Sequence, residues 1–145
     1  MEYLDASFHA SAYDIIGVQE SCIQGNVTRD MTYYTVTTSG ALADGFLGVE
    51  SWIHKDLLQG ARVHPRACGP RLLCVAVESP RLSFVLVVAH APVNAAPADE
   101  RESFWGALRA ELQRIGLRKT VILCIDGNAT MLSLIHISEP TRQKP

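Results

Sequence analysis

Two almost continuously apolar segments, joined by a short turn, constrain the fold of this chain most strongly. They comprise residues 72–78 (LLCVAVE) and 82–90 (LSFVLVVAH), and Ser79, Pro80 and Arg81 connect them. Their β-branched and aliphatic residues favour strands, and the short connection favours a hairpin. A strand without polar alternation is covered on both faces. These segments therefore predict a sheet that lies between other layers of structure.

Four further segments carry strand or helix patterns. Residues 14–20 (DIIGVQE), 31–39 (MTYYTVTTS), 46–54 (FLGVESWIH) and 121–125 (VILCI) are rich in β-branched, aromatic or apolar residues and predict strands. Glu50 lies within the third of these and is expected to be half-exposed. The glycines and prolines of residues 55–70 predict a loop, and the apolar spacing of residues 1–12 indicates a short helix.

Residues 99–115 show the clearest helical pattern. Asp99 stands three residues before Glu102, as in a capping box, and Gly116 follows the last turn. The apolar residues of this segment fall on one arc and predict a stripe that faces the core. The Phe-Trp pair in this stripe is interpreted as packing rather than as a platform for stacked bases. The stripe comprises Phe104, Trp105, Leu108, Leu112 and Ile115.

The composition describes an ordinary globular chain of one domain. It has 145 residues, of which 48% are hydrophobic and 19% charged, with a formal net charge of -2. This charge gives no overall attraction to nucleic acid. The scattered arginines could form a local basic surface, or they could be ordinary solvent-exposed side chains. Four cysteines without a CxxC pair disfavour zinc and fit a reducing, intracellular compartment, the nucleus or cytoplasm. No signal peptide or membrane-length apolar run is recognised.

Polar side chains stand where three of the expected strands end. These are Glu20, His90, and the pair Asp126 and Asn128. Carboxylate and carboxamide oxygens are ligands that Mg²⁺ or Ca²⁺ prefers, and a histidine can bind phosphate or transfer protons. Asp-Gly-Asn is equally good turn chemistry, and a histidine at a strand end is often bonded to a carbonyl at the edge of the core. The residues alone leave both interpretations open.

Four segments in order resemble successive motifs of the endonuclease/exonuclease/phosphatase superfamily, which includes apurinic-site, DNase I-like and retroelement endonucleases. They are IIGVQE, VVAHAP, the FWxxLxxEL helix and VILCIDGNA. The resemblance covers residues 1–131 and leans towards the retroelement type. It implies an α+β fold, a four-layer αββα sandwich. The chain is expected to be an incomplete, inactive part of it, because the family's N-terminal Asn strand and C-terminal Asp-His pair are not found.

The resemblance also implies a role for each polar residue at a strand end. Glu20 and Asp126 would bind Mg²⁺, with Mn²⁺ as an alternative, and Asp126 would also orient or deprotonate the attacking water. Asn128 would fix a phosphoryl oxygen, and His90 would donate a hydrogen bond to the developing charge. The intact parent is expected to be a phosphodiesterase that cleaves nucleic acid, DNA in preference to RNA. The chain departs from the family in having Gly127, where the family has phenylalanine.

Residues 132–145 resemble a translated adaptor of a transposase sequencing library, rather than an apolar strand with a disordered tail. His136 within them is therefore not regarded as catalytic.

Because much of the second sheet is expected to be absent, the inner faces of residues 72–77 and 82–88 should lack cover. The chain would then be poorly soluble or molten.

The sequence is also compatible with two other functions. A non-catalytic α/β binding or scaffold module would use the polar strand ends as turns, and Glu20, His90 and Asp126 would then lie far apart. A phosphoesterase acting on small phosphoesters would share the metal chemistry and differ in its substrate.

Overall fold

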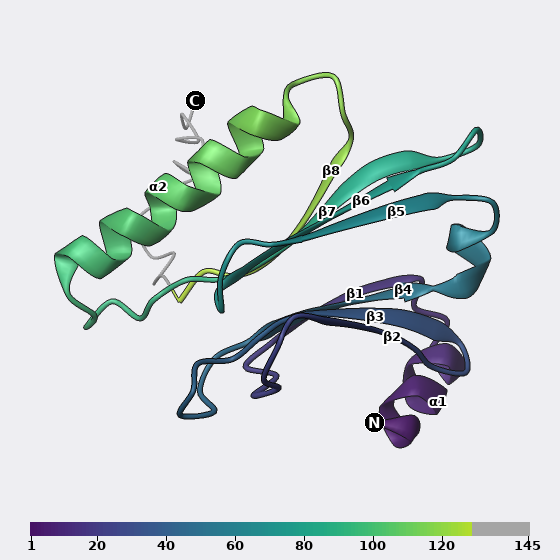
Figure 1. The fold of residues 1–145 in the computed structure, drawn as a ribbon, viewed down its shortest axis with the longest axis horizontal. Coiled ribbons are helices and arrows are strands. Elements are labelled where there is room, and N and C mark those ends of the chain that lie inside the picture. The colour runs from purple at the N-terminus through teal and green to yellow at the C-terminus, as the bar shows by residue number, and fades with distance from the viewer. Residues whose placement is uncertain (129–145) are drawn as a thin grey trace, which may run out of the picture.

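A computed structural model describes residues 1–128, which fold as two four-stranded sheets between two helices (Figure 1). The first sheet has the order β1-β4-β3-β2 and the second the order β5-β6-β7-β8. The elements are α1 (Glu2–Ala10), β1 (Ile15–Gln19), β2 (Val27–Asp30), β3 (Tyr34–Ser39), β4 (Val49–His54), η1 (Lys55–Leu58), β5 (Arg62–Ala67), β6 (Leu72–Glu78), β7 (Ser83–His90), α2 (Ala98–Ile115) and β8 (Val121–Asp126). The predicted α+β sandwich class is confirmed.

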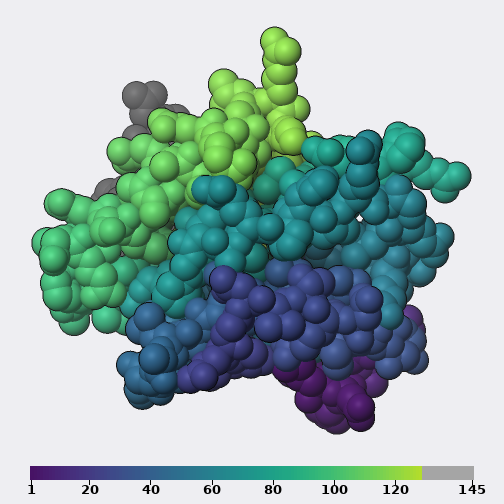
Figure 2. Space-filling model, viewed as in Figure 1, coloured from purple at the N-terminus to yellow at the C-terminus, as the bar shows by residue number. Residues whose placement is uncertain are grey.

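The two sheets pack face to face, and in Figure 2 their atoms are in direct contact along the visible face. Val49 and Ile53 of β4 lie in one core cluster with the inner-face residues of β6 and β7, which are Leu73, Val75, Val77, Phe84, Leu86 and Val88. The expectation that these inner faces lack cover is therefore wrong. The strands before residue 55 form the first sheet by themselves, which sequence periodicity alone does not distinguish from an extension of the sheet that contains β6 and β7.

Each helix covers the outer face of one sheet. Phe104, Leu108 and Ile115 of α2 pack on the outward residues of β6 and β7, and Phe8 of α1 packs on Tyr34 and Trp52. The crossover through α2 makes β7 and β8 parallel, whereas the other strand pairs of both sheets are antiparallel. The parallel pairing brings the carboxyl ends of β7 and β8 to the same end of the sheet.

Two buried acids are satisfied within the first sheet and its helix. Asp5 accepts hydrogen bonds from the backbone amides of Thr32 and Tyr33 at 3.0 and 3.2 Å. Glu50 is only 3% exposed, so the prediction of a half-exposed position is wrong. Its carboxylate accepts from Arg29, Thr38 and Trp52 at 2.9, 3.0 and 3.1 Å. Glu50 is thus a structural acid whose charge is compensated.

Other local predictions differ from the structure at identifiable places. Residues 55–70, predicted to be a loop, contain η1 and β5. The strand β5 accommodates Pro65 because it lies at the edge of its sheet with exposed side chains. The helix over 99–115 is confirmed, but Pro97 is its N-cap and no side chain caps it, so the capping box is wrong. Trp105 is 42% exposed, because it lies at the margin of the apolar arc.

No helix in residues 1–128 is long and apolar enough to cross a membrane. The expected tail at residues 132–145, with His136, lies outside the described residues.

The packing of Gly17 in β1 against the second sheet generates a prediction about stability. A Cβ at this position would lie 2.4 Å from Cys124 Cβ and 3.2 Å from a Val88 methyl group. We expect Gly17→Ala to lower the free energy of unfolding by about 1–3 kcal/mol, measured by urea denaturation. Gly106→Ala is the matched control, because a Cβ on this α2 glycine meets open space. It should stabilise by about 0.5–1 kcal/mol. Equal effects of the two substitutions would contradict the packing.

Candidate functional site

Three of the predicted polar side chains meet at one end of the sandwich. His90 ends β7 and is the register partner of Asp126, which ends β8. Glu20 directly follows β1 in the other sheet, and its Oε1 lies 3.8 Å from His90 Nε2. The structure therefore brings together side chains that are far apart in the sequence.

The alternation of side chains along β7 and β8 directs His90 and Asp126 towards the first sheet. Phe84, Leu86 and Val88 face the inter-sheet core, and His90 continues their alternation along β7. In β8, Ile122 and Cys124 face the same core, and Asp126 continues that alternation. Each polar side chain thus ends a row of core residues, where the inter-sheet space opens to solvent.

The backbone around Glu20 sets its approach from the first sheet. Glu20 has a left-handed φ of 53°, a conformation that is uncommon outside glycine and is often held at functional sites. Just before it, Gln19 Nε2 donates to the carbonyl oxygen of Cys124 at 3.4 Å. This cross-sheet hydrogen bond ties the end of β1 to β8. The carboxylate of Glu20 remains accessible, with 71% of its side chain exposed.

His90 is buried yet not fully satisfied. Only 4% of the residue is exposed, and its backbone amide donates to Arg71 O at 2.9 Å. Its Nδ1 is buried and has no hydrogen-bond partner among the described residues. A buried nitrogen without a partner costs about 1–3 kcal/mol. The ring is therefore held in place while one nitrogen retains unused hydrogen-bonding capacity.

The loop after β8 combines turn and site features. Asp126 Oδ1 accepts the backbone amide of Asn128 at 3.0 Å, which closes a side-chain turn, and Asn128 has a left-handed φ of 41°. Asn128 Nδ2 donates to Ala91 O at 2.7 Å. The turn interpretation thus describes the conformation of this loop, and Asn128 fastens it to the chain that follows β7. Asp126 itself is exposed.

A second cluster of possible ligands lies between β5, β6 and α2, and the sequence analysis did not find it. The ligand atoms of Cys68, Cys74 and Glu111 all lie within 4.8 Å of one another, the one such set of three in residues 1–128. Glu111 already pairs with Arg66 at 3.1 Å and Arg114 at 2.8 Å. Recognition of β5 as a strand would have placed the two cysteines together. Burial raises the pKa of Cys74 to about 12 and also raises the pKa of Cys68, so both thiols are protonated at neutral pH.

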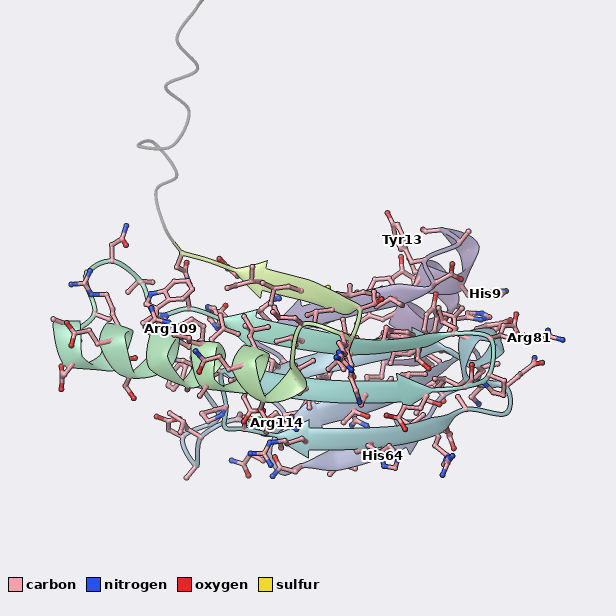
Figure 3. The ribbon with its side chains drawn as sticks, turned by 90° about the horizontal axis from the view of Figure 1, so that it is seen from above. His9, Tyr13, His64, Arg81, Arg109 and Arg114 are labelled. Atoms are coloured by element: carbon pink, nitrogen blue, oxygen red, sulfur yellow. The ribbon has the colours of Figure 1, made fainter. Side chains whose placement is uncertain are left out.

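The remaining described histidines lie elsewhere. His9 Nδ1 and His54 Nε2 are 3.1 Å apart, and the His9 ring stacks on Tyr33. Figure 3 places His9 at the end of the molecule opposite the end of β8, and His64 on β5, the other edge strand of that sheet. These histidines therefore take no part in the site at Glu20, His90 and Asp126.

No known protein family matches this chain, and no curated protein is similar to it. The relationship to the endonuclease/exonuclease/phosphatase superfamily, and the roles that it implies, therefore stay predictions.

The thiol pKa values predict how stability depends on pH. The Cys74 pKa is raised from its ordinary value of 9.0, so the folded state resists loss of the thiol proton. The resulting stabilisation is complete below about pH 9 and is lost as the pH rises towards about 12. We expect Cys74→Ala to lose less free energy of unfolding than the wild type between about pH 9 and about pH 11, measured by urea denaturation. The exposed Cys22 is the control, and Cys22→Ala should follow the wild type. Parallel pH profiles for all three proteins would contradict the pKa assignment.

Proposed function

We propose that the chain carries part of the site of a divalent-metal-dependent phosphodiesterase that acts on nucleic acid, DNA in preference to RNA. The observation that carries the proposal is the 3.8 Å separation of Glu20 Oε1 and His90 Nε2, which belong to different sheets, beside the register partner Asp126. Two accessible carboxylates next to a buried imidazole suit a metal ion and an anionic ester. A scaffold module that uses these residues as turns predicts that they lie far apart, so their proximity supports the phosphodiesterase.

The carboxylates fit a hard cation such as Mg²⁺, or Mn²⁺ in its place. Glu20 and Asp126 do not belong to a three-ligand set within 4.8 Å in the described part of the chain. This is compatible with Mg²⁺, which keeps several waters and is commonly held by one or two carboxylates. Glu20 and Asp126 would therefore hold the ion partly through water. When bound, the ion would neutralise the phosphodiester and stabilise the leaving oxygen.

The polar residues have distinct proposed roles. Asp126 orients the attacking water or accepts its proton, because its carboxylate is exposed at the strand end. His90 donates a hydrogen bond to a phosphoryl oxygen from a ring that its buried setting holds still. Asn128 acts as a positioning residue, since its amide nitrogen is engaged by Ala91 O at 2.7 Å. The direct phosphoryl contact that the resemblance implies for Asn128 stays a prediction beside this role.

The nuclease proposal predicts metal-dependent nicking of supercoiled plasmid. The resemblance expects further motifs at both ends, so the assay uses the chain extended in its natural reading frame on both sides. We expect relaxation of the plasmid with Mg²⁺ or Mn²⁺, its loss with EDTA, and a rate reduced about 100-fold or more in Asp126→Ala and Glu20→Ala. Gel electrophoresis of the plasmid forms measures the rate.

The matched control is Glu2→Gln, which removes an exposed carboxylate from α1. It should nick like the unmodified protein. Nicking that is indifferent to the loss of both Asp126 and Glu20 would rule out the proposed function.

A further inference from the structure

We infer that a pocket beside the Asp126 loop binds the nucleotide next to the scissile phosphate. This inference rests on the proposed function and adds a substrate contact to it. The pocket has a volume of about 310 Å³, and its walls include Pro92, Arg101, Trp105 and Gly127. Small-molecule sites have volumes of about 300–1,000 Å³. The pocket is thus large enough for part of a nucleotide.

The pocket shares a wall with the candidate site. Gly127 stands between Asp126 and Asn128, and Pro92 follows His90 by two residues. Figure 1 shows the start of α2 beside the end of β8, and Arg101 of α2 and Gly127 after β8 both line the pocket. The side chains of His90 and Asp126 face the first sheet and the pocket lies beside α2, so a polynucleotide whose phosphate lies at these two residues would reach the pocket by passing the end of β8.

Arg101 supplies positive charge from the first turns of α2. Its Nε is buried and has no hydrogen-bond partner among the described residues. A guanidinium group offers several donors in a plane, which suits the oxygens of a phosphate. Glu102 also lines the pocket and would repel a phosphate. A phosphate in the pocket would therefore lie nearer Arg101 than Glu102.

Trp105 supplies an aromatic surface one turn further along α2. It is 42% exposed, whereas its neighbour Phe104 is 6% exposed and packs in the core. The two rings make an edge contact with centroids 5.0 Å apart, so a buried ring supports an exposed one. Only Phe104 thus fits the interpretation of this pair as packing. Trp105 is free to stack on a base, an interaction that does not depend on sequence.

The test is a titration of the 145-residue chain, in EDTA, with a single-stranded DNA oligonucleotide of about 12 nucleotides. Stacking on Trp105 should quench tryptophan fluorescence, while Trp52, 1% exposed in the core, gives a constant background. Fluorescence anisotropy of the labelled oligonucleotide gives the affinity. We expect Trp105→Leu to abolish the quenching and to weaken binding about fivefold or more.

Arg101→Gln should weaken binding and reduce the slope of log affinity against log salt by about one. Its control is Arg109→Gln, because Arg109 is an exposed arginine of the same helix that lines a different pocket (Figure 3). Circular dichroism melts should match the wild type for all three variants. The inference is overturned if the oligonucleotide leaves tryptophan fluorescence unchanged, or if Arg101→Gln and Arg109→Gln weaken binding equally.

Failure of the subsite is distinguishable from failure of the proposed function. Binding in EDTA does not use the metal, so the quenching that depends on Trp105 tests the subsite without the metal site. If the quenching follows Trp105 while plasmid nicking is indifferent to Asp126 and Glu20, the nucleotide subsite stands and the phosphodiesterase assignment fails.

Discussion

The contact between the two sheets is the constraint on which the rest of this structure depends. Gly17 of β1 lies against Cys124 of β8, with space for no side chain between them. This approach allows Gln19 to reach the backbone of β8, and it brings Glu20 to His90. The geometry of the polar site is therefore a consequence of apolar packing. A wider spacing of the sheets would separate its two halves.

Two buried carboxylates of the structure differ from the imidazole of the candidate site in their hydrogen bonding. Glu50 and Asp5 are buried, and each carboxylate accepts several hydrogen bonds, as stability requires. His90 Nδ1 is buried without such a partner among the described residues, and Glu20 has a left-handed backbone. Departures of this kind from local rules concentrate at functional sites. Ser51 Oγ and Arg29 Nε of the first sheet are also buried without a partner among the described residues, so the choice of Glu20, His90 and Asp126 as the site rests on their convergence.

Much of the fold could be predicted from local pattern, and the failures share one physical cause. Apolar runs and helical spacing predict β6, β7, β8 and α2, because the apolar residues of each element stand in consecutive or helically spaced positions. The apolar run of β8 nevertheless leaves Val121, Leu123 and Ile125 exposed. The edge strand β5 was missed, since its exposed side chains and Pro65 carry no burial signal. Pattern also could not show that the strands before residue 55 form the covering sheet, or that Trp105 faces solvent. Those properties depend on which elements pack together. The sequence was sufficient to select Glu20, His90 and Asp126 as candidates. Only the structure shows that these three residues come together.

The most direct test of the central claim is paramagnetic broadening by Mn²⁺ in the ¹H–¹⁵N NMR spectrum of the chain. If the sheet packing builds one metal site from separate strand ends, amide signals near Glu20, His90 and Gly127 should broaden together at low Mn²⁺. Signals near the Cys68 and Cys74 cluster should stay sharp. In Asp126→Asn the joint broadening should be lost. Broadening confined to one of the three segments, or unchanged in Asp126→Asn, would contradict a shared site.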